Sequence, residues 1–99
     1  MLLHVLSKNA QQGSAFDSCL RAAAPGSVLL LIEDAVYAAV AGSDSAAQIR
    51  EQDKLRVCIL REDIEARGLQ DLVIEGLEWV DYAGFVALST ECHAVQSWY

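Results

Sequence analysis

An uninterrupted run of large aliphatic residues, Val28 to Ile32, constrains the fold of this chain more than any other feature. The pair Pro25-Gly26 stops any helix just before it. A continuous apolar run of this length is typical of a parallel strand that is buried on both faces of its sheet. A strand of that kind needs helices on each side. The run therefore predicts an α/β fold.

Further strands alternate with helices along the rest of the chain. We expect strands at 2–6, 27–32, 55–60 and 77–80, and helices at 14–24, 35–41, 43–52, 62–67 and 82–92. Ser14, Asp34 and Asp81 are the expected N-caps of three of these helices. The tail at 95–99 is predicted to be extended or irregular. This order predicts a three-layer α/β sandwich with a mainly parallel sheet of about 4–5 strands and helices on both faces.

Residues 1–99 are expected to form a single domain, because the sequence shows no linker, repeat or low-complexity stretch. Hydrophobic residues make up 54% of the chain, which predicts that some apolar surface is reserved for partners. The 14 acidic residues outnumber the 7 basic ones, and no basic cluster is present, so direct nucleic-acid contact is not expected. Without a signal-peptide pattern or a membrane-length apolar run, the expected location is the cytoplasm.

The three cysteines are widely separated, which in a cytoplasmic chain predicts free thiols rather than a disulfide framework. Cys58 falls in a buried-strand pattern, and Cys92 aligns with the apolar stripe of its helix, so both are expected to pack in the core. Cys19 lies about 60° from Phe16 on a helical projection, at the edge of the apolar stripe. Cys19 is therefore either packing material or a sulfur-handling nucleophile.

The residues near Cys19 do little to activate its thiol. It lies in the second turn of its helix, beyond most of the helix dipole, and Asp17 nearby has the wrong charge to stabilise a thiolate. A reactive Cys19 needs help from a neighbouring chain or from a residue distant in sequence.

Other kinds of site have little support in the sequence. Neither a Cys-x-x-Cys pair nor a histidine pair at helical spacing is present, so no metal site is expected. A hydrolase is not expected either, because no Gly-x-Ser-x-Gly elbow follows a strand. The loop at 7–14 precedes a helix but lacks the glycine pattern of a nucleotide site. A flavodoxin-like domain that binds a small anion remains an alternative.

Three segments taken together resemble the DsrH/TusB family of sulfur-relay proteins. The matching segments are Leu30–Ala39, Asp63–Leu69, and the C-terminal set Asp81–Val86, Ser89–Cys92 and Gln96–Trp98. The resemblance covers nearly the whole chain. DsrH-like members carry a cysteine in a Ser-Cys-Leu context in the first helix, which Ser18-Cys19-Leu20 matches. The chain is therefore closest to the DsrH branch.

This resemblance implies an α2β2γ2 heterohexamer with DsrE/TusD-like and DsrF/TusC-like subunits, which passes persulfide sulfur to a downstream acceptor protein. The sulfur is used in tRNA wobble-uridine 2-thiolation in the TusB branch and in dissimilatory sulfur oxidation in the DsrH branch. The resemblance implies that Cys19 is the catalytic persulfide carrier, with no metal or organic cofactor. The alternative is a non-catalytic structural subunit of the same heterohexamer, in which a partner chain carries the active cysteine.

Overall fold

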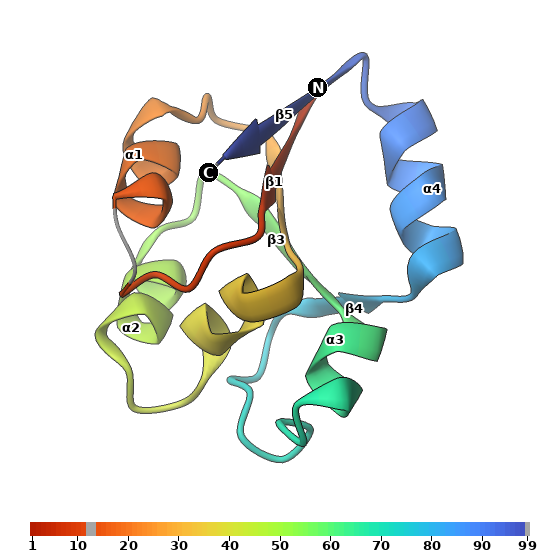
Figure 1. Ribbon diagram of the computed structural model, residues 1–99. Coiled ribbons are helices and arrows are strands. Elements are labelled where there is room, and N and C mark those ends of the chain that lie inside the picture. Colours follow the sequence, from red (N-terminus) through yellow and green to blue (C-terminus); the bar gives the residue numbers. More distant parts are fainter. Residues whose placement is uncertain (12–13, 99) are drawn as a thin grey trace.

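The computed structural model describes residues 1–11 and 14–98, and its centre is a five-stranded sheet in which every strand pair is parallel (Figure 1). The spatial order of the strands is β4-β3-β2-β1-β5. Their bounds are β1 Leu2–Leu6, β2 Val28–Leu31, β3 Arg56–Leu60, β4 Glu78–Val80 and β5 Ala94–Trp98. The fold is the predicted α/β sandwich with a parallel sheet.

Helices cover both faces of this sheet, but unequally. Four of them contribute to the larger core cluster, and we call this the multi-helix side. Their bounds are α1 Ala15–Ala22, the 3₁₀ helix η1 Glu33–Ala39, α2 Asp44–Glu51 and α3 Arg61–Ala66. The opposite face, which we call the α4 side, is covered by the single helix α4, Tyr82–Glu91. The sheet is therefore the middle layer of three.

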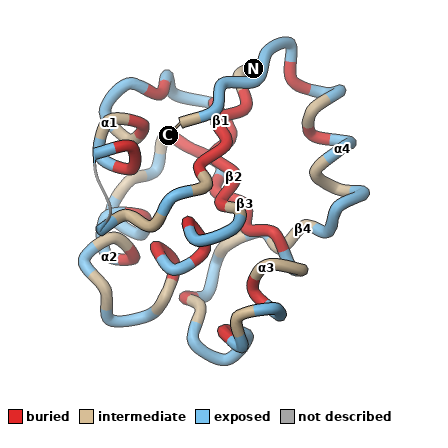
Figure 2. The backbone as a smooth tube through the Cα atoms, in the orientation of Figure 1, coloured by how far each residue is buried: buried red, intermediate tan, exposed pale blue. Residues whose placement is uncertain are grey.

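Strand β2 lies at the centre of the sheet, as its sequence predicted. All four of its residues are buried, and its side chains alternate between the two faces. Leu29 and Leu31 belong to the core of the multi-helix side, whereas Val28 and Leu30 belong to the core of the α4 side. Figure 2 shows the same burial along β1, β2 and β3. A continuous apolar run is needed here because both faces of the strand are covered.

One element is more regular than the sequence predicted, and another differs from the expectation. The tail, predicted as extended or irregular, forms β5, which pairs in parallel with β1 and leaves most of its side chains exposed. The helix expected at 35–41 is a 3₁₀ helix that begins at Glu33, so Asp34 lies inside its first turn and does not cap it. Glu33 has a positive φ of 49°, a conformation that suits a sharp exit from β2.

No helix in the part of the chain that the structure describes is long and apolar enough to cross a membrane. Tyr99, the second of the two terminal aromatic residues, lies outside the described residues.

Candidate functional site

The thiol of Cys19 is buried in the core of the multi-helix side. Its residue has 0% of its surface exposed, and it shares this core with Phe16 and Leu6. The helical projection placed Cys19 at the edge of the apolar stripe. The difference arises because α1 packs on β5 as well as on β1, so the sheet beneath the helix is wider than four strands provide. The fifth strand extends the surface that α1 covers.

Burial also determines the acidity of this thiol. Loss of solvation raises the pKa of the Cys19 thiol to about 11, and the positive charge of Lys54 offsets only part of this rise. At neutral pH the Cys19 thiol is therefore protonated in nearly all molecules. The thiolate is the form that attacks a persulfide. In this conformation Cys19 is neither accessible nor ionised.

The other two cysteines lie on the α4 side, buried as the sequence predicted. The Cys58 thiol donates a hydrogen bond to Glu78 Oε2 at 3.2 Å. Arg56 binds the same carboxylate at two points, with N···O distances of 2.5 and 2.9 Å. Burial, followed by the hydrogen bond to Glu78, raises the pKa of the Cys58 thiol to about 12. Cys92 packs beneath α4 in the same core cluster. Both residues pack as core side chains.

Helix α1, which carries Cys19, lacks the side-chain cap that α2 and α4 have. Ser14 was expected to cap α1, but its side chain makes no capping hydrogen bond. In α2 the Ser43 hydroxyl accepts from the Ala46 N–H at 3.1 Å, and in α4 Asp81 Oδ1 accepts from the Gly84 N–H at 2.8 Å. A capping bond of this kind contributes about 1 kcal/mol. The start of α1 is therefore less firmly held than the starts of these two helices.

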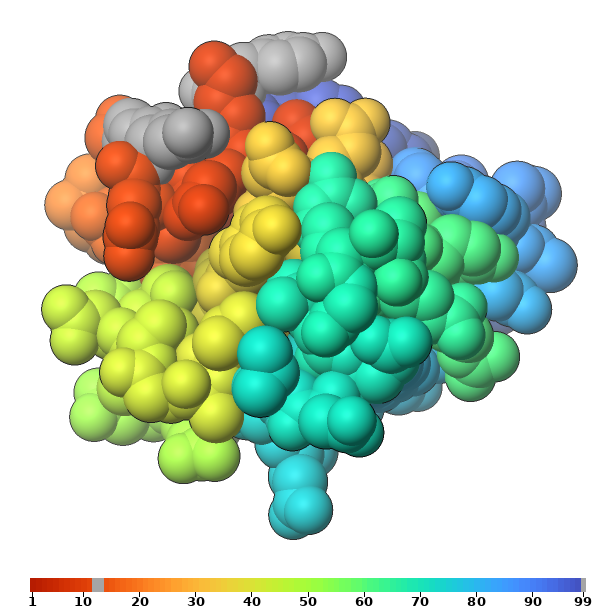
Figure 3. All heavy atoms as spheres, turned by 60° about the horizontal axis from the view of Figure 1, so that its bottom comes forward, coloured from red at the N-terminus to blue at the C-terminus, as the bar shows by residue number. Residues whose placement is uncertain are grey.

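A charged cluster that sequence reasoning did not identify links η1 to α3, which lie side by side in Figure 3. Arg67 pairs with Asp34 at 3.0 Å and with Asp63 at 3.6 Å. Asp63 Oδ2 also accepts the backbone N–H of Glu33, the residue with positive φ, at 2.6 Å. Two segments quoted for the family resemblance thus meet in space. The cluster holds the backbone that leaves the carboxyl end of β2.

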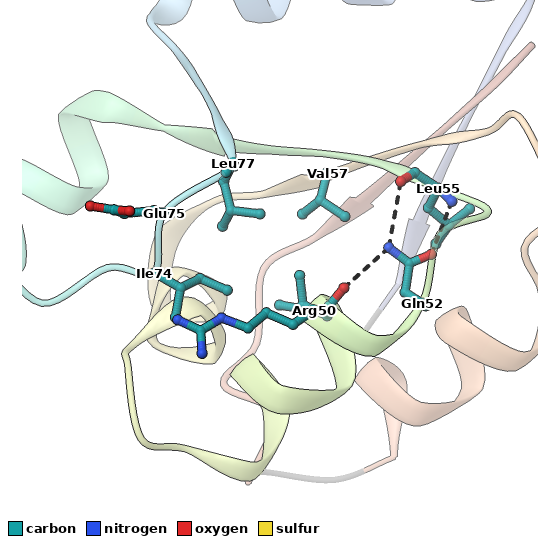
Figure 4. A pocket seen from close by; sticks show the side chains of 9 residues that line it. Arg50, Gln52, Leu55, Val57, Ile74, Glu75 and Leu77 are labelled. Carbon is teal, nitrogen blue, oxygen red and sulfur yellow. Dashed lines mark hydrogen bonds between the residues drawn. The ribbon is translucent and has the colours of Figure 1, made fainter.

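One hollow on the surface lies away from the cysteines. It has a volume of about 280 Å³ and lies between the end of α2, β3 and the segment before β4 (Figure 4). Leu55, Val57 and Leu77 give it an apolar floor. The Gln52 side chain at its edge already makes hydrogen bonds within the chain. It accepts from the Leu55 N–H at 2.9 Å and donates to main-chain carbonyls. No cysteine lines this hollow, so it offers no route to a thiol.

A second hollow of about 220 Å³ lies between α1 and α2 and is lined in part by Phe16 and Asp17, one turn before Cys19. Within residues 1–11 and 14–98 no three His, Cys, Asp or Glu side chains group together in a way that could hold a metal ion.

Comparison with known proteins identifies close sequence relatives. Residues 8–95 match the family model described as DsrH like protein. Protein TusB of Pectobacterium parmentieri is 32% identical, and Protein TusB of Salmonella typhi is 34% identical. Each alignment covers 98% of this chain and 100% of the relative.

Two solved structures share the fold. The ychN protein of E. coli superposes with a TM-score of 0.70 at 17% identity, covering 98% of both chains. A protein of unknown function from Methanobacterium thermoautotrophicum gives a TM-score of 0.66 at 14% identity, covering 96% of both chains. At these identities the structural likeness concerns the fold alone.

Proposed function

This chain belongs to the DsrH family, whose members are subunits of sulfur-relay complexes, and we propose that it serves as a structural subunit while a partner chain carries the reacting cysteine. The observation that carries this choice is the state of Cys19, which is fully buried and whose pKa is raised to about 11. A persulfide carrier must present a thiolate to its donor and then to its acceptor. The isolated chain offers neither exposure nor ionisation at this residue.

Direct transfer through Cys19 is the second candidate, and it is favoured by the match of Ser18-Cys19-Leu20 to the DsrH branch together with the missing cap of α1. A helix that starts without a side-chain cap is easier to displace when a partner binds. In this mechanism the Cys19 thiolate attacks the outer sulfur of a donor persulfide. The sulfur–sulfur bond breaks, the donor leaves as a thiolate, and Cys19 holds the outer sulfur as a persulfide. Transfer to an acceptor thiolate repeats the same exchange.

The finer assignments are proposed along with this role. The complex is an α2β2γ2 heterohexamer with DsrE/TusD-like and DsrF/TusC-like partners, it acts in the cytoplasm, and it passes sulfur to a downstream acceptor protein. The family description carries the DsrH name and the relatives carry the TusB name, so sulfur oxidation and tRNA wobble-uridine 2-thiolation are both supported. Measuring 2-thiouridine in tRNA from a strain that lacks this chain separates the two pathways.

Mass spectrometry of the assembled complex separates the structural role from the carrier role. The complex is loaded with a persulfide donor, and the mass of each intact subunit is measured. We expect no added sulfur on this chain, and an equal load on its partner in the wild type and in Cys19→Ser. Cys92→Ser is the matched control, because Cys92 is buried on the opposite side of the sheet.

A gain of one sulfur mass on this chain that disappears in Cys19→Ser would instead establish the carrier role. If the chain forms no complex with DsrE- and DsrF-like proteins, both roles are wrong.

A further inference from the structure

Helix α4 differs from the other helices in the residues that it presents to solvent. The outward sides of α1, α2 and α3 carry charged residues of both signs, namely Asp17, Arg21, Asp44, Arg50, Glu51, Arg61 and Glu65. We define the α4 outer face as Tyr82, Ala83, Val86 and Ala87, which are all exposed and uncharged. Val86 is 64% exposed and Tyr82 is 56% exposed. Figure 2 shows exposed segments recurring along α4.

The inward side of α4 is also apolar, because Leu88 and Cys92 pack on the sheet with Phe85 beside them. A helix that is apolar on all sides is characteristic of a buried helix. The Ser89 and Thr90 hydroxyls of α4 donate within the helix. Ser89 donates to the Phe85 carbonyl at 2.8 Å, and Thr90 donates to the Ala87 carbonyl at 2.9 Å. The outer face therefore offers mainly apolar contact area, together with the hydroxyl of the exposed Tyr82 side chain.

The charges around this face indicate what kind of molecule covers it. Asp81 and Glu91 lie exposed at the two ends of α4, and the whole chain has a net charge of −7. Two copies that packed their α4 helices side by side about a two-fold axis would bring acidic ends together, Asp81 near Glu91 in an antiparallel pair and each residue near its own copy in a parallel pair. Like charges placed together weaken such an interface. A second copy is therefore a poor partner for this face.

We propose that the α4 outer face docks onto a different subunit of the complex, through an apolar patch flanked by Lys or Arg side chains. The inference rests on the proposed function, because it names the surface by which this chain joins its complex. The apolar patch covers Val86 and Tyr82, and the basic side chains meet Asp81 and Glu91 at the two ends of the helix. Opposite charges at the rim set the orientation of the subunit, and the apolar centre supplies the affinity.

Exposed apolar side chains on the multi-helix side do not form a comparable surface. Leu72 is 50% exposed, but it stands alone between Asp71, which is exposed, and Val73, which is partly buried. Single exposed apolar residues are normal on a protein surface. Leu72 therefore provides a matched control for Val86, because the two are similarly exposed and lie in different regions of the molecule.

The test compares Val86→Asp with Leu72→Asp in the chain co-expressed with DsrE- and DsrF-like subunits. We expect Val86→Asp to weaken assembly by roughly tenfold or more, because it places a charge in an apolar contact, and Leu72→Asp to leave assembly unchanged. Ala87→Glu provides a second variant at a neighbouring exposed position. Thermal melting of each purified variant checks that the chain itself still folds.

The outcomes distinguish this inference from the function on which it rests. A complex that forms equally well with wild type, Val86→Asp and Ala87→Glu overturns the α4 surface but leaves the subunit role intact. A wild-type chain that dimerises alone, and loses the dimer in Val86→Asp, shows that a second copy covers α4 and overturns the heterologous partner. A wild-type chain that joins no complex at all overturns the subunit role itself.

Discussion

The two sides of the sheet use alternate residues of the same strands but are completed in different ways. On the multi-helix side, Leu29 and Leu31 lie beneath a layer of four helical elements whose outward residues include many charges. On the α4 side, Val28 and Leu30 lie beneath one helix whose outward residues are nearly all uncharged. The multi-helix side has the charged outer surface that is typical of a protein surface in contact with water. The outward face of α4 has the apolar composition of a helix that is covered by another layer of protein.

The three cysteines are divided between the two sides of the sheet. Cys19 lies on the side that is complete, where its burial is a property of the single chain. Cys58 and Cys92 lie on the side that is incomplete, beneath the helix that we expect a partner to cover. Assembly at α4 therefore adds cover over Cys58 and Cys92. Exposure of Cys19 requires movement of α1.

Truncation of a core leucine on each side should give the largest effect. Leu31→Ala removes a fully buried side chain beneath four helical elements, and we expect a loss of about 3–5 kcal/mol in the free energy of unfolding. Leu88 is the buried residue of α4 itself, and in Leu88→Ala this single helix can move toward the sheet to reduce the cavity, so we expect a loss of about 2–3 kcal/mol. Urea denaturation measures both values. Equal losses would show that the two sides are equally well packed.

A smaller loss in the free energy of unfolding should arise on the multi-helix side as pH falls, through His4. The Trp98 Nε1–H donates to His4 Nδ1 at 3.0 Å, so Nε2 carries the proton of the neutral ring. This Nε2 atom is buried, and it has no hydrogen-bond partner among residues 1–11 and 14–98. Burial lowers the pKa of His4. The unfolded chain then binds a proton at higher pH than the folded chain does. The contribution of neutral His4 to the free energy of unfolding is therefore fully present above about pH 6.5. It is lost as pH falls through the lowered pKa of the folded chain.

The urea midpoint of His4→Phe should depend less steeply on pH than that of the wild type between about pH 7.5 and about pH 5. Parallel pH profiles for wild type and His4→Phe would show that His4 does not titrate with unfolding.

The smallest change in stability should come from Glu78→Gln on the α4 side. The Arg56–Glu78 pair is about half exposed, so its loss should cost less than about 1 kcal/mol. The thiol should respond more clearly, because the hydrogen bond and negative charge of Glu78 help to raise the pKa of Cys58. We expect faster alkylation of Cys58 in Glu78→Gln, measured by peptide mass spectrometry in mildly alkaline buffer. Cys19 is the internal control, and an unchanged Cys58 rate would contradict this account.

Most of the fold could be predicted because its signals are local. The apolar run of β2, the Pro25-Gly26 stop and the Asp81 cap each lie within a few residues of the element that they define. Strand β5 lacks such a signal, because Gln96 and Ser97 are polar and its side chains are mostly exposed. Its strand character comes from pairing with β1, which no short window of the sequence contains.

The candidate site was harder to predict for the same reason. The burial of Cys19 depends on β5, whose position beside β1 is set by long-range pairing. The contacts of Arg67 with Asp34 and of Asp63 with the Glu33 N–H join segments about thirty residues apart, as the separations of 33 and 30 show. The sequence contained these residues within the family resemblance but carried no sign that they meet. The family itself was confirmed, whereas the role of Cys19 stays a prediction.

The pairing of β1 with β5 has a consequence for the order in which the chain folds. The other parallel pairs join strands that follow one another, whereas the Trp98–His4 hydrogen bond closes a loop of 94 residues. Closing so long a loop costs more chain entropy and makes folding slower. We therefore expect β1 to β4 to assemble first and β5 to dock late. Until then the open edge of β1 is a template for intermolecular pairing, so aggregation during refolding should depend on protein concentration.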